Sequence, residues 1–210
     1  MVREAVRAGA ALELLVLSQG TRFAAPAPET VELSRGLFRQ IAQTRTPQGV
    51  LAVAHVQPCP IAESLAAAKN AGWPLIVLDG IQDPGNVGGI IRTAAAAGAP
   101  ALAVLPGTAD PYGPKAVRAS AGNLFRIRVA AARWADLEGL DGLGADARGE
   151  PLEAVDLERA GILVFGGEGR GLSREGLRRV AIPMAGEVES LNVAAAAAVL
   201  IYEVRRLKAR

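Results

Sequence analysis

Asn86 and Arg92 are the residues whose types and spacing first suggest chemistry. They follow an apolar run at residues 75–78, which predicts a buried strand, and a turn rich in glycine and proline. We expect Asn86 to cap a helix that runs to Ala97, with Arg92 six residues further along it. A loop asparagine and an arginine near a helix start, at the carboxyl end of a strand, suit an anion or ribose site. A plain strand, turn and helix in which Arg92 forms a salt bridge fits this segment equally well.

A glycine-rich segment follows a second apolar run at residues 162–165. It reads Gly166-Gly167-Glu168-Gly169-Arg170-Gly171, and its four glycines allow the backbone to approach a ligand closely. The spacing Gly167-x-Gly169-x-Gly171 also fits the nucleotide loop of Rossmann-type enzymes, with Glu187 near the position of a ribose-binding acid. Too few residues follow Gly171 to build that doubly wound fold, which disfavours the Rossmann interpretation.

The third segment contains Ile182-Pro183-Met184 and Ser190-Leu191-Asn192-Val193, and it precedes an alanine-rich helix. Together the three segments resemble the three motifs of the SpoU/TrmH family of SPOUT RNA methyltransferases. The first is similar to Asn-Val-Gly-x-Ile-x-Arg-Thr and the second to Gly-x-Glu-Gly-x-Gly. The third is similar to Ile-Pro-Met-x-Gly followed by Ser-Leu-Asn-Val, in the family's usual order and spacing. The chain departs from the family at Ala194, where a second serine is often found.

The resemblance implies an enzyme that uses S-adenosylmethionine to methylate ribose 2′-hydroxyls in RNA. It implies rRNA as the substrate more than tRNA, because an accessory domain of the kind expected here is common in the rRNA-modifying branch. It also implies a homodimer and an α/β fold that has a parallel sheet with a C-terminal trefoil knot. The alternative is a non-catalytic RNA-binding protein that has kept the methyltransferase fold.

The same resemblance assigns site residues. The cofactor would lie close to Gly166, Gly167 and Glu168, with its adenine lined by Ile182, Met184 and Leu191; without the resemblance, these last three could be ordinary core residues. Arg92 matches the catalytic arginine of the family. A guanidinium is essentially always protonated, so we expect Arg92 to grip an RNA phosphate and stabilise alkoxide charge rather than act as a base. The resemblance gives Asn86, Ser190 and Asn192 the task of orienting the hydroxyl or holding the loop.

The amino-acid composition limits the classes of protein and of active site that this chain can form. Half of the 210 residues are hydrophobic and only 4% are aromatic, so alanine, valine, leucine and isoleucine must build the core. The net charge is only +2, but arginines far outnumber lysines. This excess suits phosphate binding, and a codon bias explains it equally well. The single Cys59 and single His55 exclude a disulfide framework, a cysteine metal cluster and a histidine-centred triad, and we expect no metal. No secretory signal or membrane-spanning run is evident, so we expect a cytoplasmic protein.

The predicted helices and strands divide the chain into two domains and a linker helix between them. Residues 1–60 alternate helix-like and strand-like segments, including a capped helix at 34–44, and indicate a small α/β domain. The resemblance makes this an RNA-recognition domain, and its abrupt start leads us to expect a missing first strand. Residues 61–73 predict a linker helix. Residues 74–210 predict a domain in which strands alternate with helices around a parallel sheet, and the resemblance makes it the methyltransferase domain. Within it we expect a helix at 173–178 and, at 142–151, a loop with room for a short strand.

Overall fold

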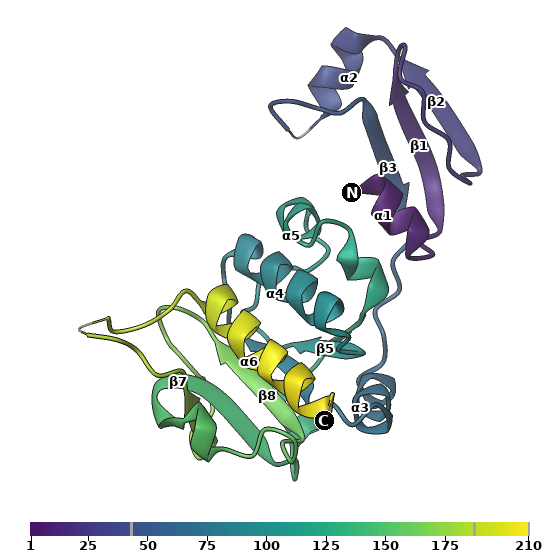
Figure 1. Ribbon diagram of the computed structural model, residues 1–210. Coiled ribbons are helices and arrows are strands. Elements are labelled where there is room, and N and C mark those ends of the chain that lie inside the picture. The colour runs from purple at the N-terminus through teal and green to yellow at the C-terminus, as the bar shows by residue number, and fades with distance from the viewer. Residues whose placement is uncertain (43, 187, 210) are drawn as a thin grey trace. The chain divides into compact units, whose positions relative to one another are not determined.

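The computed structural model describes residues 1–42, 44–186 and 188–209. The chain divides into two compact units, Met1–Gln57 and Pro58–Arg210, each built around its own sheet (Figure 1). Among the described residues, no helix is both long and apolar enough to cross a membrane.

The first unit holds a three-stranded sheet in the order β2-β1-β3. The central strand β1 (Leu12–Ser18) is parallel to β2 (Glu29–Leu33) and antiparallel to β3 (Val50–Ala54). Two short helices accompany the sheet, α1 (Val2–Arg7) and α2 (Arg35–Ile41). The Ser34 hydroxyl caps α2 by accepting the Leu37 N–H, and Phe38 anchors the helix with 1% of its surface exposed. Helix α2 is shorter than the sequence predicts, and Gln43 near its predicted end lies outside the described residues.

The second unit is built on six parallel strands, which confirms the predicted parallel sheet. Their order is β6-β5-β4-β8-β7-β9. The strands are β4 (Leu75–Asp79), β5 (Ala101–Val104), β6 (Arg128–Ala131), β7 (Gly142–Pro151), β8 (Ile162–Gly166) and β9 (Arg178–Ala181). Strand β4 is completely covered, because its side chains pack on both faces of the sheet, as the uninterrupted apolar run predicts.

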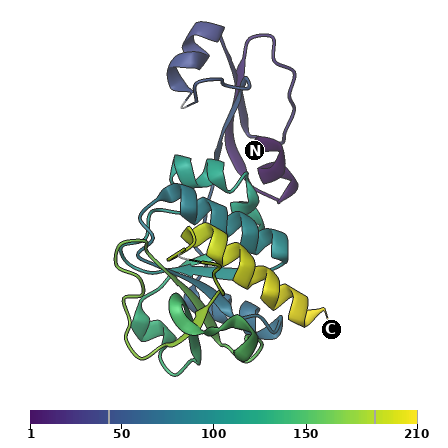
Figure 2. The same ribbon diagram turned by 60° about the vertical axis from the view of Figure 1, so that its left-hand side comes forward.

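Helices cover both faces of this sheet. On one face α4 (Pro84–Ala97) and α6 (Val193–Lys208) pack side by side, as Figure 2 shows, over a core that includes Ile76 and Phe165. The short helix α5 (Pro114–Ala119) packs against α4. On the other face α3 (Ile61–Asn70) contacts β4, β5 and β6 over a smaller core around Val77 and Val164. The described residues of this unit also form short 3-10 helices at Asn123–Arg126, Trp134–Leu137 and Leu152–Ala154.

Three sequence predictions are wrong in detail. Helix α4 begins at Pro84 and is capped by Asp83, which accepts the Gly85 N–H at 2.8 Å, so Asn86 lies in the first turn instead of capping it. Residues 142–151 form strand β7 along their whole length, whereas the sequence predicts a loop with at most a short strand in it. A Cβ on Gly144 would come within 2.3 Å of the Leu172 side chain, so the small residue at this position lets Leu172 pack closely against the sheet.

The third wrong prediction is a helix at residues 173–178. This segment forms bends and turns before β9 begins at Arg178. The Ser173 N–H and hydroxyl both donate to the carboxylate of Asp79, so this serine is held by a distant strand and does not cap a helix.

Candidate functional site

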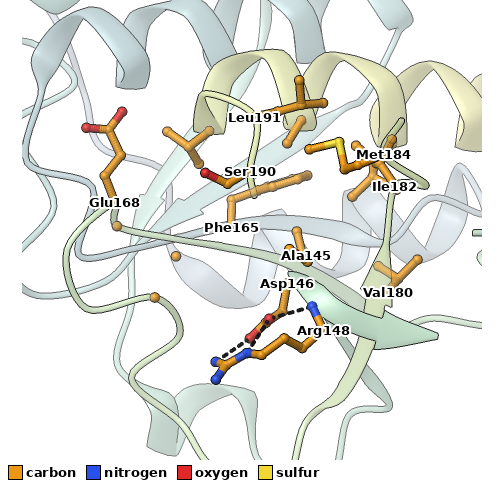
Figure 3. A pocket seen from close by; sticks show the side chains of 17 residues that line it. Ala145, Asp146, Arg148, Phe165, Glu168, Val180, Ile182, Met184, Ser190 and Leu191 are labelled. Carbon is orange, nitrogen blue, oxygen red and sulfur yellow. Dashed lines mark hydrogen bonds and ion pairs between the residues drawn. The ribbon is translucent and has the colours of Figure 1, made fainter. Parts of the chain in front are cut away.

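A cavity of about 310 Å³ opens beside the carboxyl ends of β8 and β9, where open parallel sheets usually bind ligands (Figure 3). Its apolar lining includes Phe165, Val180, Ile182, Met184 and Leu191. Its polar side chains include Asp146, Arg148, Glu168 and Ser190. A cavity of this size, mainly apolar with a few polar groups, has the character of a small-molecule site.

Every residue predicted to bind the cofactor lies on this wall: Gly166, Gly167, Glu168, Ile182, Met184 and Leu191. Ile182 and Met184 follow strand β9, whereas Leu191 just precedes α6, so residues from two segments meet at one place. Figure 3 shows these three side chains on the α6 side of the cavity. They offer an apolar surface on which a planar ring could lie. The residues present therefore suit an adenine nucleoside such as S-adenosylmethionine.

Backbone contacts hold the glycine-rich loop against the end of β4. The Gly167 N–H donates to the Asp79 carbonyl at 3.0 Å, and the Gly171 N–H donates to the Gly167 carbonyl at 2.8 Å. A Cβ on Gly167 would lie 2.4 Å from the carbonyl oxygen of Gly80. This oxygen belongs to the backbone, so it could move aside only if the chain itself shifted. Only glycine lets the loop come this close, and the loop is thereby fixed beside the cavity.

The side chain of Asp79 fixes the other end of the same loop. Only 3% of Asp79 is exposed, and its carboxylate accepts the Ser173 N–H at 2.6 Å and the Ser173 hydroxyl at 2.8 Å. The hydroxyl oxygen of Ser173 in turn accepts the indole N–H of Trp134 at 2.9 Å, and the Arg174 guanidinium lies 5.2 Å from the Trp134 ring. Sequence analysis did not identify this network. The one sign of it in the sequence was Asp79, an acidic residue directly after the apolar run at residues 75–78.

Asn86, Glu168 and Asn192 meet through their side chains, which brings the three motifs into one place. The Asn86 amide donates to Glu168 Oε1 at 2.7 Å, and the Asn192 amide donates to the same oxygen at 3.3 Å and to Asn86 Oδ1 at 3.1 Å. The side-chain oxygen of Asn192, Oδ1, accepts hydrogen bonds from the N–H groups of Ala194 and Ala195 at the start of α6. Asn192 therefore caps that helix while it holds Glu168.

The other two predicted site residues are placed differently. Ser190 lines the cavity, and its hydroxyl is visible beside Phe165 in Figure 3. Arg92 is exposed on α4, six residues or about 9 Å along the helix axis from Asn86. It is not one of the described residues that line the cavity. The structure thus leaves Arg92 exposed to a partner that approaches from solvent.

Asp146 and Arg148 form a charged wall of the cavity that sequence analysis missed, because their segment was taken as a loop. The Asp146 carboxylate accepts the Arg148 backbone N–H at 2.9 Å and contacts the Arg148 guanidinium, and it accepts from Arg179 at 2.9 Å. Burial raises the pKa of the Asp146 carboxyl, but the bonds from Arg148 and the charges of Arg148 and Arg179 outweigh it, so the pKa is lowered. Among the described residues, no cluster of three or more His, Cys, Asp or Glu could hold a metal ion.

Comparison with known proteins identifies the family. The model of the SpoU rRNA methylase family matches residues 74–202, which contain all three motifs. The chain belongs to this family. The 23S rRNA (guanosine(2553)-2′-O)-methyltransferase RlmP of Bacillus subtilis is 32% identical over 219 aligned residues, which cover 98% of this chain and 85% of RlmP.

Two solved methyltransferase structures with bound S-adenosylmethionine have the same fold. The SpoU methyltransferase AviRb of Streptomyces viridochromogenes superimposes with a TM-score of 0.80 and 27% identity, over 99% of this chain and 87% of AviRb. An rRNA methyltransferase of Sinorhizobium meliloti gives a TM-score of 0.81 and 27% identity, over 98% of this chain and 84% of that one. The motif resemblance in the sequence is therefore confirmed at the level of family.

Proposed function

We propose that this SpoU family member transfers a methyl group from S-adenosylmethionine to the 2′-hydroxyl of a ribose in RNA. The observation that carries the proposal is the convergence of the three motifs. Asn86, Glu168 and Asn192 are joined by hydrogen bonds, and Glu168 also lines the cavity that is suited to the cofactor. A non-catalytic RNA-binding protein would have no evident use for a cofactor cavity of this kind.

The glycine-rich loop and the last motif hold the cofactor in this proposal. The backbone of Gly166 and Gly167 approaches it, and Ile182, Met184 and Leu191 contact the adenine. Bound S-adenosylmethionine supplies an electrophilic methyl group on a positively charged sulfur. Much of the rate enhancement would then come from holding the ribose hydroxyl in line with that methyl group.

Arg92 is the proposed catalytic residue. Because its guanidinium stays protonated, Arg92 cannot accept the proton of the ribose hydroxyl; it binds a phosphate next to the target ribose and stabilises negative charge that develops on the oxygen. Its exposure on α4 leaves it open to RNA. Ser190, facing the cavity, orients the hydroxyl, and Asn86 and Asn192 keep Glu168 and the loop in place.

We favour rRNA as the substrate, with residues 1–60 as an RNA-recognition domain, 61–73 as the helix that follows it and 74–210 as the catalytic domain. The support is the similarity to RlmP, named as a 23S rRNA methyltransferase, over almost the whole of this chain. The division of the chain after Gln57 agrees with a separate first domain. An rRNA substrate implies a cytoplasmic site of action.

We also infer a C-terminal trefoil knot and a homodimer, as family membership implies. In support of the dimer, α6 exposes Val199 and Tyr202, with 42% and 49% of their surfaces accessible, on the same helical face as Ala195. Sedimentation velocity of the purified chain tests the dimer directly.

The experiment that tests the function measures transfer of labelled methyl from S-adenosylmethionine to unmodified rRNA and tRNA pools. We expect label in rRNA at one nucleotide that resists alkaline cleavage, because a 2′-O-methyl group blocks attack on the neighbouring phosphate. Arg92→Ala should abolish transfer and leave cofactor binding intact, whereas Arg92→Lys, which keeps the charge but loses the planar fork, should retain a small part of the activity. Full activity of Arg92→Ala would refute the role of Arg92. An absence of both label and cofactor binding in the wild type would favour the RNA-binding alternative.

A further inference from the structure

Three of the six arginines in the first unit line one hollow of its surface. Residues 1–57 contain six arginines and four glutamates, with no lysine or aspartate. Three of those arginines, Arg3, Arg7 and Arg22, line one hollow together with Thr21 and Phe23. They come from helix α1 and from the segment that follows β1, so the fold collects them from two stretches of chain.

The charges of this hollow are only partly neutralised. Arg7 Nη1 pairs with Glu4 Oε1 at 2.8 Å within α1. The ion pairs found among the described residues include none with Arg3 or Arg22, and all three arginines are exposed. The Arg3 guanidinium lies 5.6 Å from the centroid of the half-buried Phe23 ring. Such contact with an aromatic face orients the guanidinium without neutralising its charge.

This combination suits a nucleotide. The planar fork of arginine matches the oxygens of a phosphate, and unpaired bases of RNA stack on aromatic rings and on guanidinium planes. A groove that combines positive charge with a stacking surface is typical of proteins that bind single-stranded nucleic acid. An acidic peptide would use the charges and would have no need of the ring.

We propose that Arg3, Arg22 and Phe23 form a docking site for an unpaired stretch of the substrate RNA. Arg3 and Arg22 bind its backbone phosphates, and one base stacks against Phe23 or the Arg3 guanidinium plane. Arg7, already paired with Glu4, contributes only to the local positive field. The proposal rests on the proposed function insofar as the RNA is taken to be the methylation substrate.

The test measures binding of the full chain to a fluorescently labelled single-stranded 12-mer RNA of mixed sequence, by anisotropy at several salt concentrations. The double variant Arg3→Ala/Arg22→Ala should bind at least about tenfold more weakly. Its slope of log affinity against log salt should fall by about 1.4, or about 0.7 for each lost phosphate contact on a single strand. Phe23→Leu should weaken binding severalfold with the slope unchanged, because stacking involves no counterion release.

The matched control is Arg39→Ala/Arg45→Ala, which removes two exposed charges from the same unit outside the hollow. It should bind within about twofold of the wild type. Arg22→Ala alone leaves the Arg3–Phe23 contact intact. If the loss in the double variant comes from lost phosphate contacts and not from altered folding, this single variant should lower the slope by about 0.7. Equal affinity and slope for the two double variants would overturn the docking site.

Failure of the docking site and failure of the proposed function can be told apart. If the wild type methylates rRNA, and the Arg3→Ala/Arg22→Ala variant is as active and binds RNA as tightly as the control variant, the proposed function stands and the docking site is refuted. A wild type without methyl transfer whose RNA affinity depends on Arg3 and Arg22 retains the site and rejects the function.

Discussion

Replacement of Asp79 by asparagine should loosen the glycine-rich loop and weaken cofactor binding, although Asp79 itself is buried and does not line the cavity. The substitution keeps the shape of the side chain. The amide oxygen of asparagine can still accept the Ser173 N–H, and its NH₂ group can donate to the Ser173 hydroxyl oxygen. What disappears is the negative charge that strengthens both bonds.

The size of the effect follows from these two contacts. A hydrogen bond to a charged group contributes about 1.5–3 kcal/mol and a neutral one about 0.5–1.5 kcal/mol. Two such replacements would cost about 2–3 kcal/mol, and we expect about 2 kcal/mol because Ser173 is exposed and water can compensate. That corresponds to a fall in Tm of about 4–8 °C for a protein of this size. The dissociation constant for S-adenosylmethionine should rise by no more than about 30-fold, because the Gly167 N–H bond to the Asp79 carbonyl remains as a second anchor.

Calorimetry measures both quantities, as Tm by scanning and as the dissociation constant by titration with S-adenosylmethionine. The matched control is Asp156→Asn, an exposed aspartate that pairs with Arg159 on the surface and should change Tm by less than about 2 °C. An Asp79→Asn variant with the Tm and cofactor affinity of the wild type would show that the charge of this carboxylate does not position the loop.

Two further predictions concern the cavity wall. Gly167→Ala should weaken S-adenosylmethionine binding at least about tenfold in a calorimetric titration, because its Cβ would lie 2.4 Å from the Gly80 carbonyl oxygen. Gly169→Ala, whose Cβ meets nothing within 4 Å, should bind as the wild type does, and equal losses in both variants would contradict the steric argument. Asp146→Asn should lower Tm at pH 7, because the lowered pKa of Asp146 means that its ionised form stabilises the fold. This stability is present above the unfolded pKa of about 3.9 and is lost as the pH falls through the lower folded pKa, so the two melting curves should converge in acid. A difference in Tm that stays constant down to pH 2 would exclude titration of Asp146 as its cause.

The central strands, the parallel sheet and the positions of the three motifs could be predicted from the amino-acid sequence alone. These features depend on local signals. The uninterrupted apolar run at residues 75–78 predicts a strand covered on both faces, and the four glycines between residues 166 and 171 allow the backbone to approach a ligand or another segment closely. The capping function of Ser34 could also be inferred from its position before an amphipathic segment.

Which residues of those segments meet in the site depends on long-range contacts in the folded chain. Asn86 and Glu168 are 82 residues apart, and Asp79 and Ser173 are 94 apart, so no local pattern could pair them. The same holds for β7, whose three glycines and Asp146 locally favour a loop. Close packing of Gly142 against Leu177 and of Gly144 against Leu172, together with parallel pairing with β8 and β9, outweighs that preference. Local propensities amount to about 1 kcal/mol per residue or less, and long-range packing and hydrogen bonds together exceed them, so the chain's final contacts set the site.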